Sequence, residues 1–188
     1  MQMNPNVRRV LSFVILISAV IATGCDAIVP DGCQLTSADA ERFLGGDVTY
    51  LSRDDSLLDL TEDERGDERV SACGYKTKDG SWMMLQENRY ASEAEAVATY
   101  DLWREKIAST QKKGGPGDYW EVDRFAVYGD ATMVHAYHSD GEHVDVAGRV
   151  GTTAFLIRSL GAPSNKAFSY VELRSYAVAT GQRLAGKK

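Results

Sequence analysis

The first 24 residues limit which part of the chain can fold into a domain, because they have the composition of an export signal. They contain no acidic residue, carry Arg8 and Arg9, and continue into a run of thirteen mostly apolar residues, 10–22. At about 1.5 Å per residue, a helix of that length measures roughly 20 Å, which is shorter than the roughly 30 Å hydrocarbon core of a bilayer. We therefore expect residues 1–24 to be a cleaved signal peptide and not a membrane span.

The signal ends in small residues followed directly by a cysteine, in the order Ala22-Thr23-Gly24-Cys25. This ending resembles the lipobox of bacterial lipoproteins, although Ala22 stands where leucine is usual. The resemblance implies that Cys25 receives a diacylglycerol and becomes the first mature residue. Acyl chains, at about 0.8 kcal/mol per buried CH₂, would anchor the protein on the extracytoplasmic face of the cell membrane, which is periplasmic if the source has an outer membrane. The alternative is an ordinary secretory signal whose Cys25 joins a disulfide.

The chain beyond the signal is acidic. The signal holds two of the 21 basic residues and none of the 27 acidic ones, which leaves 19 basic against 27 acidic side chains, a formal charge of −8. Such a surface repels phosphate backbones, so no nucleic-acid partner is expected. Residues 25–32 are interpreted as a short tether, and residues 33–188 are long enough for a single domain with its own core. No cofactor is expected apart from the acyl chains on Cys25.

Two cysteines remain once Cys25 is assigned to lipid, Cys33 and Cys73. An exported protein lies where disulfides persist, so we infer that these two residues are bonded to each other. The alternative is a pair of free or metal-binding thiols, but the chain has no CxxC spacing to favour it.

Two Asp-Gly pairs between strand-like runs predict β-hairpins, because these residues readily take the positive φ of a tight turn. The first turn, Asp79-Gly80, would join residues 73–78 to 81–90. The second turn, Asp140-Gly141, would join residues 132–139 to 142–147. Further strands are expected at residues 48–51 and 153–160.

Capping motifs and apolar spacing predict three helices. Thr36 and Ser92 each begin a capping box, with an acidic residue three positions later. The second helix carries an apolar stripe, typical of a core-facing side, up to a break at residues 112–117. The third is expected to begin near Ser164, with Gly181 as a candidate early end.

Residues 53–69 contain eight acidic residues and three arginines, and we interpret them as a solvated, mobile excursion. With this segment set aside, the predicted fold class is α+β. It would be an antiparallel sheet built from hairpins, with helices packed on one face and one disulfide. The expected element order is α-β-β-β-α-β-β-β-α.

Several short motifs are spread over about residues 32–160. They are Cys33-Gln34-Leu35-Thr36, Asp39-Ala40, Leu44-Gly45, Cys73-Gly74-Tyr75 and Gly129-Asp130-Ala131. Together they resemble the CxLLTxxEA...LG...CxY...GDxA pattern of small bacterial lipoproteins that are abundant in actinobacteria, with Gln34 where leucine is usual. The resemblance implies the same disulfide and a compact α+β domain of sensor or accessory type. It carries no catalytic residues.

The sequence contains no GxSxG, Walker, GxGxxG or HExxH motif. The second hairpin offers a different possibility. Across a two-residue Asp140-Gly141 turn, His138 would lie opposite His143, with Asp145 further along the same outer face. His135 would point to the opposite, apolar face, which should be the core. Two imidazoles and a carboxylate suit Zn²⁺, so these three residues are a candidate metal site. The alternative is that they are ordinary polar residues on the solvent side of a hairpin.

Tyr119 and Trp120 follow a glycine-rich stretch, and they are either a contact surface or the rim of the core. Our leading hypothesis is a non-enzymatic binding or accessory module, held at the membrane by its lipid, with a protein or envelope component as its partner. One alternative is an inhibitor of a secreted hydrolase, and another is a metal-dependent envelope enzyme built around the histidine hairpin.

We expect Cys33 and Cys73 to form the sole disulfide of the mature protein. Replacing either residue by serine should lower the free energy of unfolding by about 2 to 5 kcal/mol and reduce the secreted yield, because the cross-link restricts the unfolded chain. Mass spectrometry without reductant tests the bond directly. Two thiols that can be alkylated in the folded mature protein would contradict it.

Overall fold

The computed structural model describes residues 34–111, 117–138, 141–161 and 170–186. None of the helices within these ranges is long and apolar enough to cross a membrane. In chain order, the elements are α1 (Ser37–Leu44), β1 (Val48–Leu51), the 3-10 helix η1 (Ser56–Leu58), α2 (Glu62–Gly66), β2 (Val70–Thr77), β3 (Trp82–Arg89), α3 (Glu93–Gln111), β4 (Gly117–Phe125), β5 (Asp130–His138), β6 (Gly141–Val150), β7 (Thr153–Gly161) and α4 (Tyr170–Leu184).

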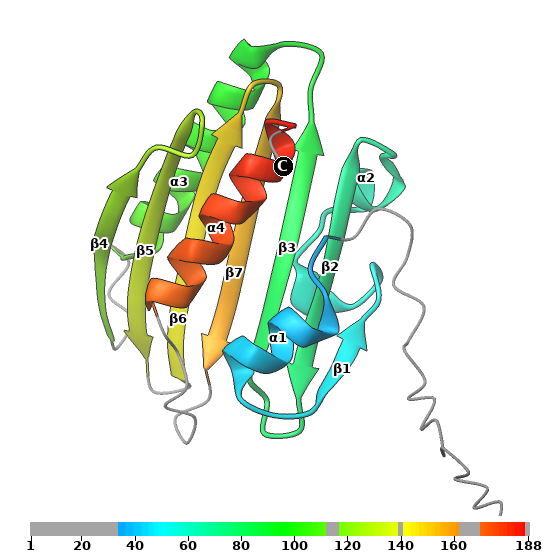
Figure 1. Cartoon of the computed structure of the whole chain (residues 1–188), viewed down its shortest axis with the longest axis vertical. Helices are drawn as coiled ribbons and strands as arrows, with labels where there is room; N and C mark the ends of the chain where they lie inside the picture. The colour runs from blue at the N-terminus through cyan, green and yellow to red at the C-terminus, as the bar shows by residue number, and fades with distance from the viewer. Residues whose placement is uncertain (1–33, 112–116, 139–140, 162–169, 187–188) are drawn as a thin grey trace, which may run out of the picture.

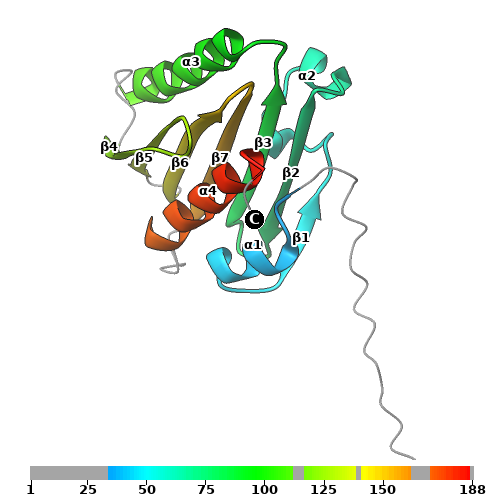
Figure 2. The same cartoon turned by 45° about the horizontal axis from the view of Figure 1, so that its top comes forward.

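The strands form one antiparallel sheet of seven, in the order β1-β2-β3-β7-β6-β5-β4. This confirms the predicted α+β class with an antiparallel sheet. The prediction that the helices pack on one face is wrong. Figures 1 and 2 show α1 and α4 in front of the sheet and α3 behind it.

The sequence of β3 explains why both faces are covered. Met83 and Leu85 belong to the core cluster beneath α1 and α4, whereas Trp82 and Met84 belong to a second cluster with Leu58 of η1. Successive residues of a strand point to opposite faces, so a continuous apolar run requires a layer on each side. A third cluster, in which α3 packs on β5, β6 and β7, completes the second layer.

Residues 53–69 are ordered as η1 and α2, so their interpretation as a mobile excursion is wrong. Leu58 and Leu60 are buried against the sheet. The guanidinium of Arg53 donates to the backbone carbonyls of Glu64 and Asp67, and that of Arg65 donates to the carbonyl of Arg53. The acidic composition suggested disorder, but two leucines of the segment are buried against the sheet. Two of its arginines also donate hydrogen bonds to backbone carbonyls of the same segment. The observed order therefore contains η1, α2 and β4 in addition to the predicted elements.

The N-cap predicted at Thr36 and the capping box predicted at Ser92 are confirmed, but the reciprocal backbone bond at Thr36 does not form. The Asp39 backbone N–H donates to the Thr36 hydroxyl, and the first helix ends at Gly45 with a φ of 74°. At α3, the Glu95 backbone N–H donates to the Ser92 hydroxyl, while the Glu95 carboxylate accepts from the Ser92 backbone N–H. These contacts satisfy N–H groups that a helix cannot satisfy by itself.

The first hairpin forms at the predicted place, with a loop one residue longer than expected. The Thr77 backbone N–H donates to the Ser81 carbonyl at 2.8 Å, which leaves residues 78–80 between the strands. Gly80 has a φ of 94°, in the region that favours glycine, as is usual for the last residue of a three-residue hairpin loop.

The last helix is described from Tyr170, and its predicted start near Ser164 lies outside the described residues. Gly181 does not end the helix, which continues to Leu184. A Cβ atom built on Gly181 would lie 1.6 Å from Cγ1 of Val127, a residue that is 1 % exposed. This glycine lets α4 approach the segment between β4 and β5.

We predict that Gly181→Ala lowers the free energy of unfolding by about 1 to 3 kcal/mol, because the added methyl group overpacks the contact with Val127. Helix propensity alone would make the alanine variant more stable by roughly 0.5 to 1 kcal/mol. The sign of the measured change therefore shows whether overpacking against Val127 outweighs helix propensity. Gly66→Ala in α2 is the matched control, since a Cβ there meets nothing within 4 Å. Chemical denaturation measures both variants, and a stabilised Gly181→Ala protein would contradict the prediction.

Candidate functional site

The cysteines assigned from the sequence lie in different parts of the chain. Cys25 and Cys33 are outside the described residues, so the lipidation and the Cys33–Cys73 bond stay predictions. Cys73 lies on β2 and is 1 % exposed. It belongs to the same core cluster as Leu35, which follows Cys33 by two positions. This arrangement is compatible with the predicted bond.

Tyr119 and Trp120 lie on β4, which is one of the two edge strands of the sheet. Their backbones pair with Ala136 and His135 of β5. Their side chains are outside the part that the structure describes, so the proposed contact surface stays a prediction. The sequence pattern did not predict this strand.

The expected pairing of His138 with His143 is wrong. His138 pairs with Gly141, and His143 pairs with Ala136, so the register is shifted by two residues. The reason lies in the neighbouring strand. A Cβ on Gly141 would be 2.2 Å from the Gly161 carbonyl oxygen of β7, so this glycine belongs to β6 and serves close strand packing.

The face that carries His143 and Asp145 is also not an outer face. Asp145 is only 9 % exposed, and its neighbours on this face pack against Tyr100 and Ile107 of α3. Burial raises the pKa of the Asp145 carboxyl, while the Arg158 guanidinium opposes this shift. The Arg158 Nε atom lies 3.5 Å from the Asp145 carboxylate.

Among the described residues, no group of three histidines, cysteines or acidic residues is arranged to hold a metal ion. The His138 side chain lies outside that part of the chain, so the metal site at His138, His143 and Asp145 stays a prediction. Within the part that is described, Arg158 is the cation placed next to Asp145.

A polar cluster that the sequence did not predict lies on the opposite face, where α4 begins. We call it the Tyr–His–Glu cluster, and it consists of Tyr170, His135 and Glu142. The Tyr170 hydroxyl donates to Glu142 Oε1 at 2.8 Å and lies 2.6 Å from His135 Nε2. His135 Nε2 is in turn 2.9 Å from Glu142 Oε1. The cluster joins β5, β6 and α4.

Burial controls the protonation of this cluster. It lowers the pKa of His135, and the nearby Glu142 carboxylate acts in the opposite direction. The pKa of Tyr170 is raised, first by burial and then by its hydrogen bond to Glu142. Near neutral pH, Tyr170 is therefore a neutral phenol and His135 a neutral imidazole, and both groups are bonded inside the cluster.

Alternation along the second hairpin placed His135 on the core face, and this is confirmed by its 7 % exposure. The partner that completes the cluster comes from α4, 35 positions later. Spacing along one strand carries no information about a contact with a distant helix, so the cluster had no sequence signal.

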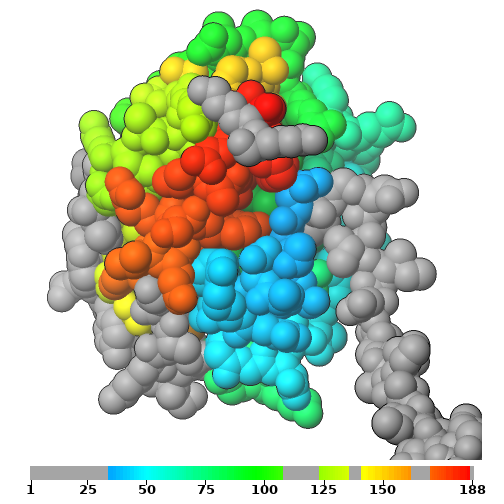
Figure 3. All heavy atoms as spheres, in the orientation of Figure 1, coloured from blue at the N-terminus to red at the C-terminus, as the bar shows by residue number. Residues whose placement is uncertain are grey.

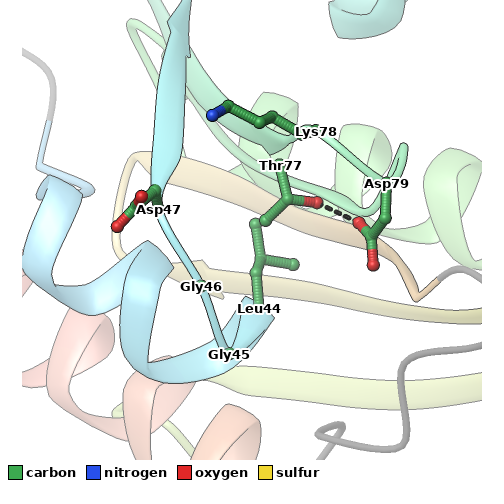
Figure 4. Close-up of a pocket in the computed structure, with 7 residues that line it drawn as sticks. All are labelled: Leu44, Gly45, Gly46, Asp47, Thr77, Lys78 and Asp79. Atoms are coloured by element: carbon green, nitrogen blue, oxygen red, sulfur yellow. Dashed lines mark hydrogen bonds between the residues drawn. The ribbon is translucent and has the colours of Figure 1, made fainter.

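An open depression of about 340 Å³ lies at one end of the sheet (Figure 4). Its lining comes from the α1–β1 connection and the β2–β3 loop: Leu44, Gly45, Gly46, Asp47, Thr77, Lys78 and Asp79. The Thr77 hydroxyl donates to the Asp79 carboxylate, which also accepts from the Ser81 backbone N–H. These bonds lower the pKa of Asp79 and serve the hairpin loop. The charged residues of the depression are exposed.

Comparisons of this chain with protein-family models, with curated proteins and with solved structures found no match.

The lowered pKa of His135 predicts how stability depends on pH. As the pH falls below about 6.5, the unfolded chain binds a proton at this histidine before the folded protein does. The free energy of unfolding should therefore decrease in this range, until the pH reaches the folded-state pKa. His135→Gln should show a shallower decrease than the original protein. Urea titrations from pH 7.5 to 5 make the comparison, and equal slopes for the two proteins would contradict it.

Proposed function

We propose that this protein is a lipid-tethered extracytoplasmic lipoprotein whose domain is a non-enzymatic binding or accessory module of the cell envelope. The observation that carries the proposal is the acid-free N-terminal segment that ends in Ala22-Thr23-Gly24-Cys25. A basic start, a short apolar run and small residues before the cysteine are the parts that an export signal needs.

The described polar side chains make contacts within the fold, and this supports a binding role over a catalytic one. In the Tyr–His–Glu cluster, the groups bind one another and hold the start of α4 on the sheet. Asp145 is next to Arg158, and Arg149 binds both Glu93 and Asp130. Each of these contacts joins two elements of the fold, so the polar side chains are occupied in holding the domain together.

The length of the tether limits where a partner can be met. Nine residue steps separate Cys25 from Gln34, the first described residue. At about 3.3 to 3.6 Å per residue, a fully extended tether reaches roughly 30 Å. A domain held this close to the bilayer meets components of the membrane surface and of the envelope next to it.

We predict that Cys25→Ser abolishes acylation and moves the protein from the membrane fraction to the soluble one. The serine lacks the sulfur that would accept the diacylglycerol, while the domain beyond residue 33 is unchanged. Detergent partitioning and mass spectrometry of the N-terminal peptide measure the two effects.

Ala22→Leu is the matched control, because it brings the segment closer to the usual lipobox and should leave acylation intact. Circular dichroism of the Cys25→Ser protein verifies that the domain is folded. A Cys25→Ser protein with a normally acylated N-terminus would refute the assignment.

A further inference from the structure

The two helical layers of the domain differ in charge. We define the tether-side layer as residues 34–47 and 170–186, and the far layer as residues 53–69 and 93–111, which include α2 and α3. The tether-side layer carries four acidic and three basic side chains, a net charge of −1. The far layer carries twelve acidic and five basic side chains, a net charge of −7. The far layer is therefore the more acidic of the two.

The chain enters the domain on the tether-side layer. The Tyr176 hydroxyl of α4 donates to the Gln34 carbonyl at 3.3 Å, and Leu35 is fully buried in the cluster beneath α1 and α4. Figure 3 shows α1 and α4 next to each other on this face of the molecule. Because the Gln34 carbonyl is hydrogen-bonded to α4 and Leu35 is packed, the tether begins at a defined place on this layer and not at the far layer.

We infer that the tethered domain rests with its tether-side layer toward a bilayer of anionic phospholipid and turns its far layer outward. The inference rests on the lipid tether proposed above. The negative potential of such a bilayer decays within a Debye length, about 8 Å at physiological ionic strength. Helical layers on opposite sides of a sheet are roughly 20 Å apart, so the potential acts mainly on the nearer layer.

Both the tether and the charge distribution favour the same orientation. A tether of at most roughly 30 Å that begins on one layer keeps that layer close to the lipid. Turning the domain over would bring a layer of net charge −7, instead of −1, against anionic headgroups. The tether-side layer is thus the surface that lies against the membrane, and the far layer is the one open to solution.

Two exposed aliphatic residues report on the orientation without any substitution. Val171 on α4 is 75 % exposed, and Leu102 on α3 is 62 % exposed. The full chain would be expressed, and its mature product purified from membranes with labelled methyl groups. It would be reconstituted in nanodiscs of phosphatidylcholine and phosphatidylglycerol that contain a gadolinium-chelating lipid. In methyl NMR spectra, we expect the paramagnetic relaxation enhancement to be severalfold greater for the Val171 methyl groups than for those of Leu102.

Charge variants test whether the difference in charge between the two layers causes this orientation. Glu62→Lys/Asp63→Lys on the far layer should bring the ratio of the two enhancements toward one, as should high salt or discs without phosphatidylglycerol. The matched control, Glu41→Lys on α1, should increase the ratio. Equal or greater enhancement at Leu102, or a ratio that ignores both salt and the charge variants, would overturn the inference. A protein that does not join the discs would instead refute the lipid tether, so the two failures are distinct.

Discussion

The structure depends on a sheet that is apolar on both faces. Residues 82–85 of β3 form a continuous apolar run, and their side chains alternate between two core clusters. Such a sheet is stable in water only if helices or ordered segments cover each side. The acidic segment 53–69 therefore has to fold, because Leu58 and Leu60 complete the cover over β2 and β3. The contrast in charge between the two layers follows from this requirement.

Covering both faces also determines how polar side chains are used. His135, Asp145 and Glu87 all lie on strands beneath a helix, and each is less than a tenth exposed. Each is next to a group from another element, as in the contact of Glu87 with Arg183 of α4. Each contact joins two elements of the fold and satisfies a buried polar group, so these contacts are expected to hold the layers in place. The same burial makes them poorly accessible to a substrate.

The proposed role combines this domain with a lipid anchor. In that role, a short tether that begins between α1 and α4 would join a domain with two helical layers to the bilayer, and the packing of Leu35 would make the point of attachment part of the core. Orientation at the membrane would then be a property of the fold, because the two layers would present different charges to the headgroups. A flexible attachment remote from the core would not have this consequence.

The sequence by itself determined the features that depend on neighbouring residues: the N-cap at Thr36, the capping box at Ser92, the first hairpin, the apolar stripe of α3 and the core position of His135. Tertiary structure decided the register of the second hairpin, since Gly141 is needed for close packing against Gly161. It also decided that helices cover both faces, and it brought Tyr170 to His135. The physical reason is that local propensities act over a few residues, whereas the burial of a shared surface depends on segments far apart in the chain.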